Sequence, residues 1–168
     1  MQYAWTCGCC GKQYSTLREG FAYAAPDYWF AIPAAERQSR GKCDNNLCHI
    51  EDVGLFVRGC VEIPVVGTDT SYIWGVWVSV SEQSFHRILE LWDAPDVENE
   101  PSKFGWLSNA ISIYPPTLNL KTNLHLRSNN IRPAIELEPT DHPLAVEQRR
   151  GITIERVLEI TAAMSPHH

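Results

Sequence analysis

The sequence predicts an α+β domain in which antiparallel β-hairpins form a sheet with helices packed on one side, preceded by a cysteine-containing N-terminal segment. Two pairs of β-branched or alternating runs are separated by short polar turns, a pattern typical of hairpins. Apolar residues recur at helical spacing directly after the first pair. Four of the six cysteines stand within the first 43 residues.

The length of 168 residues suits one domain, because a chain of this size can bury a continuous core. A composition of 44% hydrophobic and 20% charged residues excludes a disordered chain. We expect residues 1–52 to form an N-terminal subdomain that needs the rest of the protein to hold its aromatic side chains, with a short helix at 34–40. Residues 53–168 then form the α+β body.

The first half of the body reads as a hairpin followed by a helix. Residues 55–66 and 71–80 are β-branched and aromatic runs on either side of the turn residues 67–70. Ser81 is a suitable helix cap, and Glu82 suits the positive N-terminal end of a helix. The apolar residues at helical spacing that follow are Phe85, Ile88, Leu89 and Trp92.

The second half reads as a second hairpin followed by two helices. After a polar, proline-containing connection at 93–102, residues 117–127 alternate as in a half-buried strand. Residues 131–138 form the partner strand, with Pro133 at its start or at a sheet edge. Asp141 is expected to cap the next helix, in which Pro143 occupies the first turn and Gly151 follows the end. A final helix covers residues 153–163.

The run Cys7-Gly8-Cys9-Cys10-Gly11-Lys12 carries the clearest chemistry in the chain. Cys7 and Cys10 flank a tight turn, and Gly11 follows at a position that can take positive φ, which is half of a zinc-knuckle site. We therefore predict a zinc-knuckle-like segment with structural Zn²⁺, whose binding energy would help the poorly patterned N-terminal residues to fold. Two other interpretations stay open: simple reduced thiols, and redox chemistry by Cys7, Cys9 and Cys10 beside Lys12.

Several long motifs resemble, in the same order, the bacterial family catalogued as domain of unknown function 2199. The motifs are CxCCGK at 7–12, VRGCVEIPV at 57–65, WGVWVSVSE at 74–82, FGWLSN at 104–109, YPPTLNLK at 114–121 and RPAIELEPTDHPLAVEQRRGI at 132–152. The resemblance covers nearly the whole chain and implies no activity, substrate or partner.

The resemblance also implies which cysteines complete the zinc site. Cys48 and Cys60 stand where such a protein has cysteine, whereas Cys43 matches no pattern of the family. Cys43 and His49 nevertheless stay open as alternatives to Cys60. The predicted metal ligands are Cys7, Cys10, Cys48 and Cys60.

A catalytic interpretation uses His142 as a general base oriented by Asp141 or Glu147. The spacing differs from that of an HExxH metal helix, and we prefer a structural interpretation in which Asp141 caps and His142 bonds locally. Arg132 with Glu136 or Glu138 is a further charged candidate. The tryptophans, which can line a ligand cleft but are more typical of a core, are Trp74, Trp77, Trp92 and Trp106.

The net charge of −6 and the scattered basic residues argue against nucleic-acid binding. The sequence shows no membrane span and no signal peptide, so we expect a cytoplasmic protein with reduced cysteines. The function we expect is that of a non-enzymatic bacterial protein that binds a protein or small-molecule partner, with Zn²⁺ in a structural role. The alternative is a hydrolytic or thiol-redox enzyme that uses His142 with its acidic neighbours, or the Cys7, Cys9 and Cys10 cluster.

Overall fold

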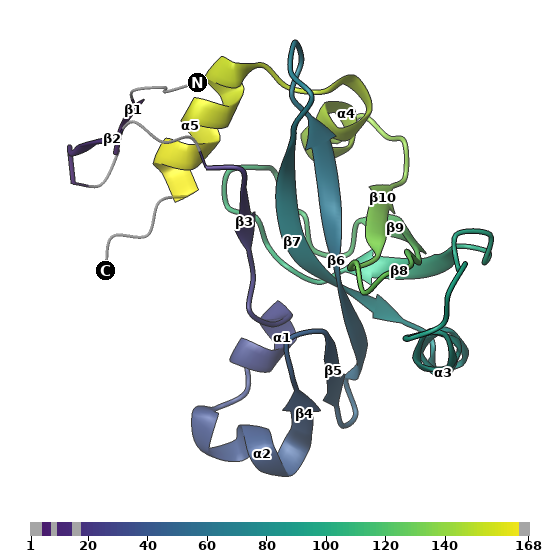
Figure 1. Cartoon of the computed structure of the whole chain (residues 1–168). Coiled ribbons are helices and arrows are strands. Elements are labelled where there is room, and N and C mark those ends of the chain that lie inside the picture. The colour runs from purple at the N-terminus through teal and green to yellow at the C-terminus, as the bar shows by residue number, and fades with distance from the viewer. Residues whose placement is uncertain (1–4, 8–9, 15–17, 165–168) are drawn as a thin grey trace.

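The computed structural model describes residues 5–7, 10–14 and 18–164 (Figure 1). The strands are β1 (Trp5–Thr6), β2 (Gln13–Tyr14), β3 (Gly20–Ala22), β4 (Gly41–Cys43), β5 (Leu47–Ile50), β6 (Gly54–Pro64), β7 (Ser71–Val80), β8 (Lys103–Leu107), β9 (Lys121–His125) and β10 (Ala134–Leu137). The helices are α1 (Asp27–Phe30), the 3-10 helix η1 (Ala34–Glu36), α2 (Arg37–Arg40), α3 (Glu82–Glu90), α4 (Pro143–Arg150) and α5 (Ile154–Met164).

Five strands of the main sheet close into a ring. Strands β6 to β10 pair antiparallel with their neighbours in chain order, and β10 then pairs parallel with β6, with Ala134 opposite Cys60. The first half of β6 pairs with β5 instead, and β4 extends the sheet beyond β5. Strand β3 adds to β7 in parallel. β6 therefore has three neighbouring strands, because it changes partner along its length.

The main core consists of the apolar side chains that alternate along these strands, because successive residues of a strand point to opposite faces. Val57, Val61 and Ile63 of β6 are fully buried, as is Trp74 of β7. Three helices complete this core, with the buried residues Ile88 of α3, Leu144 of α4, and Val157 and Ile160 of α5.

A second apolar cluster joins the N-terminal segment to the other face of β6 and β7. It contains Ile32, Cys48, Ile50, Phe56 and Trp77. The indole N–H of Trp77 donates to the backbone oxygen of Tyr23 at 2.9 Å, so the tryptophan also holds the segment through a hydrogen bond.

Buried Asn109 completes the attachment of the N-terminal segment. Its Oδ1 accepts from the backbone N–H of Trp77 at 2.8 Å, and its Nδ2 donates to the backbone oxygen of Ala25 at 2.9 Å and to Asp27 Oδ1 at 3.1 Å. The second carboxylate oxygen of Asp27 accepts from the N–H of Ala110. One side chain thus bonds to β7, to Ala25 before α1 and to Asp27, the first residue of α1.

The α+β class is confirmed, and so are both hairpins and the helix capped by Ser81, whose hydroxyl accepts from the N–H of Ser84 at 3.1 Å. The helices lie at several places around the closed sheet, so the expected packing on one side is wrong (Figure 1).

The expected knuckle includes residues 8–9, which lie outside the described residues. In the described part of the chain, no helix has the length and apolar character needed to cross a membrane.

The predicted cap of α4 is one residue off. His142, and not Asp141, is the N-cap, and its Nδ1 accepts from the N–H of Leu144 at 3.1 Å. Pro143 stands at the first helical position, which fixes the cap at the residue before it. The final helix, predicted over 153–163, is confirmed as α5.

Substitution of Gly59 tests the closure of the ring. A Cβ at Gly59 would lie 2.7 Å from Ile135 Cδ1 and 2.8 Å from the backbone oxygen of Pro133, so β10 would have to move away from β6. We expect Gly59→Ala to lower the free energy of unfolding by about 2 kcal/mol, measured by urea denaturation. Gly54→Ala in the same strand is the control, because its nearest neighbour would be 3.5 Å away. Equal stability of the two variants would contradict the closure.

Substitution of Asn109 tests the attachment of the N-terminal segment. Asn109→Ala would leave the N–H of Trp77 and the oxygen of Ala25 without these buried partners. We expect a loss of about 3 kcal/mol in the free energy of unfolding, measured in the same way. Asn99→Ala, at an exposed position in the loop before β8, should change stability by less than about 0.5 kcal/mol. A similarly small effect of Asn109→Ala would show that the hydrogen bonds of Asn109 contribute little to the free energy of unfolding.

Candidate functional site

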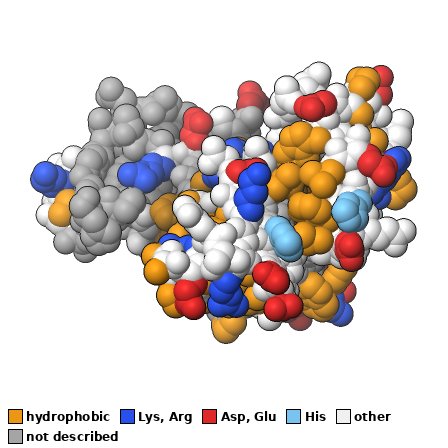
Figure 2. All heavy atoms as spheres, turned by 90° about the horizontal axis from the view of Figure 1, so that it is seen from below, with side chains coloured by type: hydrophobic (Ala, Val, Ile, Leu, Met, Phe, Trp, Pro, Cys, Tyr) orange, Lys and Arg blue, Asp and Glu red, His pale blue; other side chains and the backbone are white. Residues whose placement is uncertain are grey.

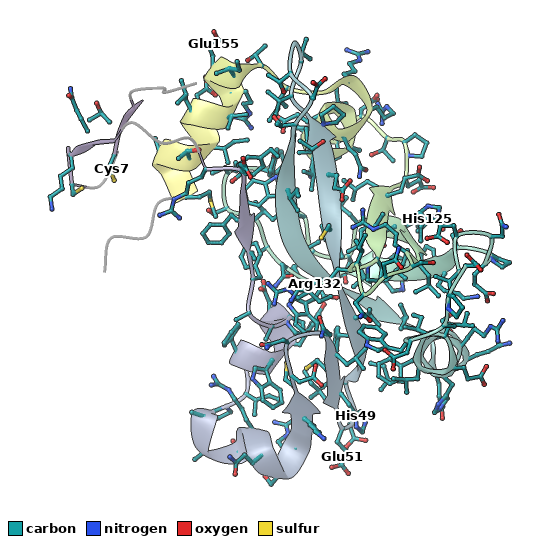
Figure 3. All side chains as sticks on the ribbon, in the orientation of Figure 1. Cys7, His49, Glu51, His125, Arg132 and Glu155 are labelled. Carbon is teal, nitrogen blue, oxygen red and sulfur yellow. The ribbon has the colours of Figure 1, made fainter. Side chains whose placement is uncertain are left out.

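Three chain segments meet where β6 changes its partner. The backbone N–H of Arg58 donates to the oxygen of Asn46 in the β4–β5 turn at 2.9 Å. Two residues further on, the N–H of Cys60 donates to the oxygen of Pro133, just before β10, also at 2.9 Å. Figure 3 shows Arg132 near this crossing of the strands. The closure of the ring thus brings the loop at 126–133 next to the turn at 44–47.

Arg58, Arg127 and Arg132 lie together at this point, and we call them the arginine cluster. Arg58 Nη1 donates to the backbone oxygen of Asn45 at 3.3 Å, and Arg132 Nε donates to Asn46 Oδ1 at 3.1 Å. Arg127 Nη1 forms a salt bridge with Glu62 Oε1 at 2.7 Å. In these contacts, the acceptors of Arg58 and Arg132 are therefore neutral oxygens.

Arg58 is the member of the arginine cluster whose positive charge is least offset by nearby acceptors. Its Nε is buried and has no hydrogen-bond partner among the described residues. Burial lowers the pKa of Arg58, and the positive charge of Arg132 lowers it further. A buried donor without a partner is costly, and so is a partly buried charge that stands beside a like charge. The cluster carries a surplus of positive charge in a chain whose net charge is negative.

A pocket of about 240 Å³ opens beside the arginine cluster. Its polar wall includes Arg127, Arg132 and Asn46, and its apolar wall includes Trp92, Leu126 and Ile131. Charged and apolar side chains thus line the same small volume. This combination is typical of sites that orient a small ligand by a few polar contacts and bury its apolar part.

Cys60 lies next to the cluster, in a neighbouring groove of about 430 Å³ that Glu62 and His125 also line. Burial raises the pKa of the Cys60 thiol, although the three arginines act in the opposite direction. The thiol, and not the thiolate, is therefore the resting form. Because the thiolate is the nucleophile, the groove does not present an activated cysteine.

A third hollow, of about 550 Å³, lies between the β5–β6 turn and α3. His49, Val53, Phe85 and His86 contribute to its walls, with acidic residues at the edge. Figure 2 views the end of the molecule that carries β4 and β5, where hydrophobic side chains reach the surface between charged and histidine side chains. These mixed walls define no class of ligand as clearly as the arginine cluster does.

The predicted metal ligands lie in three parts of the chain. Cys7 is buried beside the turn before β2, where the N–H of Gly11 donates to its oxygen at 3.0 Å, and Gly11 has the expected positive φ of 70°. Cys10, in the same turn, is exposed. Cys48 lies in β5 and Cys60 in β6.

The four predicted ligands do not form one site in the structure. Among the described residues, no three His, Cys, Asp or Glu side chains are grouped so that they could hold a metal ion. Figure 3 shows Cys7 far from His49, which follows Cys48 in β5. Cys9 lies outside the described residues. Zn²⁺ at Cys7 and Cys10 stays a prediction, whereas Cys48 and Cys60 are not placed to complete it.

The alternative catalytic residues each have other partners. His142 caps α4 through Nδ1, and its Nε2 lies 3.2 and 3.1 Å from the backbone oxygens of Pro115 and Pro116. Glu147 accepts from the hydroxyl of Tyr114 and from Arg156 Nε. Asp141 is exposed. The local bonding expected for His142 is what the structure shows, and its ring nitrogens face backbone atoms.

The sequence pointed to only one member of the arginine cluster, Arg132, and the partners expected for it were wrong. Arg132 was expected to face Glu136 or Glu138, but its guanidinium binds Asn46, while Glu136 Oε1 lies 3.6 Å from His125 Nε2. Arg58 carried one usable signal: it is a charged residue in a strand whose other residues, apart from Glu62, are apolar or glycine. Its neighbours in the cluster are far away in sequence, so no local pattern connects them.

The comparisons with known proteins agree with the motifs of the sequence. The model of a bacterial family described as "Uncharacterized protein conserved in bacteria (DUF2199)" matches residues 6–152. No curated protein and no solved structure matches the chain. Because the match covers most of its length, the chain belongs to the DUF2199 family of bacterial proteins.

Proposed function

We propose that this protein binds a small organic anion without chemically changing it, and that the arginine cluster and the adjoining pocket are the binding site. The observation that carries the proposal is the uncompensated charge of Arg58, whose Nε is buried without a partner among the described residues. An anion in the pocket beside Arg132 would offset the repulsion between the guanidinium groups of Arg132 and Arg58, although Arg58 itself does not line the pocket.

The pocket supports an organic anion more than a bare inorganic one. Arg127 and Arg132 line the pocket together with the apolar side chains of Trp92, Leu126 and Ile131. A ligand with a carboxylate or phosphate on a compact apolar group can bind the arginines and also contact the apolar side chains. A volume of about 240 Å³ suits a molecule about the size of one substituted aromatic ring.

Two observations favour binding over catalysis. The thiol of Cys60, the nearest nucleophile, has a raised pKa. The ring of His142 is directed at backbone atoms, and Glu147 is engaged by Tyr114 and Arg156. His142 and Glu147 are thus engaged elsewhere, and neither they nor Cys60 line the pocket beside the cluster.

Structural Zn²⁺ at the Cys7–Cys10 turn is a separate proposal, supported by the tight turn and the positive φ of Gly11. Metal analysis of untagged protein, purified without added zinc, tests it directly. Zinc that is present in the unchanged chain and lost in Cys10→Ser would support the proposal. Equal zinc content in the two proteins would reject it.

Calorimetric titration with phenyl phosphate tests the anion site. This probe combines a charged group with one aromatic ring, and we expect it to bind, whereas phenol should not bind measurably. Arg132→Gln should weaken binding about tenfold or more, since a charge-assisted hydrogen bond contributes about 1.5 to 3 kcal/mol. Because Arg132 is exposed, the substitution should leave the fold intact.

Arg150→Gln is the matched control, because Arg150 is an exposed arginine on α4 that does not line the pocket. It should bind phenyl phosphate like the unchanged protein. Equal affinity of all three proteins would reject the arginine cluster as the site. Release of phosphate from the probe that disappears in His142→Ala would instead favour the hydrolytic alternative.

A further inference from the structure

The hairpin of β4 and β5 places two cysteines directly opposite each other. Cys43 pairs with Cys48 in the register of these antiparallel strands. The N–H of Asp44 donates to the oxygen of Leu47 on one side of this pair. Hydrogen-bonded and non-hydrogen-bonded pairs alternate along an antiparallel ladder, so Cys43 and Cys48 form a non-hydrogen-bonded pair.

This position has the dimensions of a disulfide. Opposite residues in a non-hydrogen-bonded pair have Cα atoms about 4.5 Å apart, which lies within the range of about 4.4 to 6.8 Å found in disulfides. Each cysteine also influences the pKa of the other, as expected for neighbouring thiols. A bond between the two sulfurs would therefore require little movement of the backbone.

We propose that Cys43 and Cys48 are a thiol–disulfide exchange site that a small-molecule disulfide, such as glutathione disulfide, oxidises to an intramolecular disulfide. Exposure assigns the two roles. Cys43 is partly exposed and can meet the oxidant, whereas Cys48 is buried at 1% exposure and can reach only its neighbour. This inference is independent of the anion site.

The exchange proceeds in two balanced steps. The Cys43 thiol loses its proton, and its sulfur attacks glutathione disulfide; the Cys43–glutathione bond forms, the original S–S bond breaks, and one glutathione leaves with a proton. Cys48 then loses its proton and attacks the sulfur of Cys43, which releases the second glutathione with a proton. Two cysteine thiols are oxidised, and one small disulfide is reduced to two thiols.

The surroundings of both thiols make the reduced form the resting state. Burial raises the pKa of Cys43 and that of Cys48, and the negative charge of Asp44 raises both further. Since the thiolate is the attacking species, exchange should be slow and should need an excess of oxidant.

Peptide mapping after oxidation tests the proposal. Reduced full-length protein is incubated with excess glutathione disulfide, quenched in acid, alkylated under denaturing conditions and digested with trypsin. Cleavage after Lys42 and Arg58 gives a peptide, residues 43–58, that contains both cysteines. We expect this peptide to carry no alkyl group and no glutathione, but an internal disulfide.

Two controls make the result specific. A synthetic peptide of residues 43–58, treated in parallel until it is oxidised, shows that the oxidant is sufficient. Cys60, whose cross-strand neighbours are Gly75 and Ala134, should not enter an intramolecular disulfide. Two alkyl groups on residues 43–58 from the folded protein, or a disulfide from Cys43 to any other cysteine, would overturn the proposal.

Single substitutions test the assigned order of attack. Cys48→Ser should keep glutathione on Cys43, because the residue that releases it is missing. Cys43→Ser should leave Cys48 reduced, because the buried thiol cannot meet the oxidant. Glutathione on Cys48 in the second variant, with none on Cys43 in the first, would show that the roles are reversed and would contradict the assignment by exposure.

Discussion

The parallel pairing of β10 with β6 is the constraint on which the rest of the structure depends. It turns a row of antiparallel strands into a closed ring around the main core. The close approach requires Gly59, where any side chain would meet Ile135 and the backbone of Pro133. The same pairing fixes the loop before β10, and thus Arg127 and Arg132, beside Arg58. The same strand pairing therefore closes the sheet and brings the residues of the candidate site together.

The second attachment, through Trp77 and Asn109, sets the position of the N-terminal segment on this ring. The β4–β5 hairpin belongs to this segment and contributes to both proposals. The oxygens of its turn accept from Arg58 and Arg132, and its strands carry the cysteine pair. Cys48 is also part of the apolar cluster around Trp77, which explains why its thiol is buried.

Local patterns predicted both hairpins and the three longer helices, but not β8 or the strands of the N-terminal segment, and they predicted the long-range pairing poorly. The β6–β7 hairpin follows from two β-branched runs around a turn, and α3 follows from Ser81 and the spacing of its apolar residues. The parallel pairing joins residues that lie more than 70 positions apart, and no local signal marks it. The arginine cluster depends on this pairing, so each of its members looks like an ordinary charged residue in the sequence. The sequence did not indicate the cysteine pair of β4 and β5 either, because these strands are short and lack a clear alternating pattern.

An isotope-filtered NMR experiment on the protein with bound phenyl phosphate tests whether the closure of the ring creates an anion site lined by apolar side chains. We expect intermolecular nuclear Overhauser effects from the phenyl protons to the side chains of Ile131 and Trp92, which line the pocket beside Arg132. Contacts only to Phe85 and Val53, in the hollow beside α3, would contradict it. So would a saturated complex without contacts to Ile131 or Trp92.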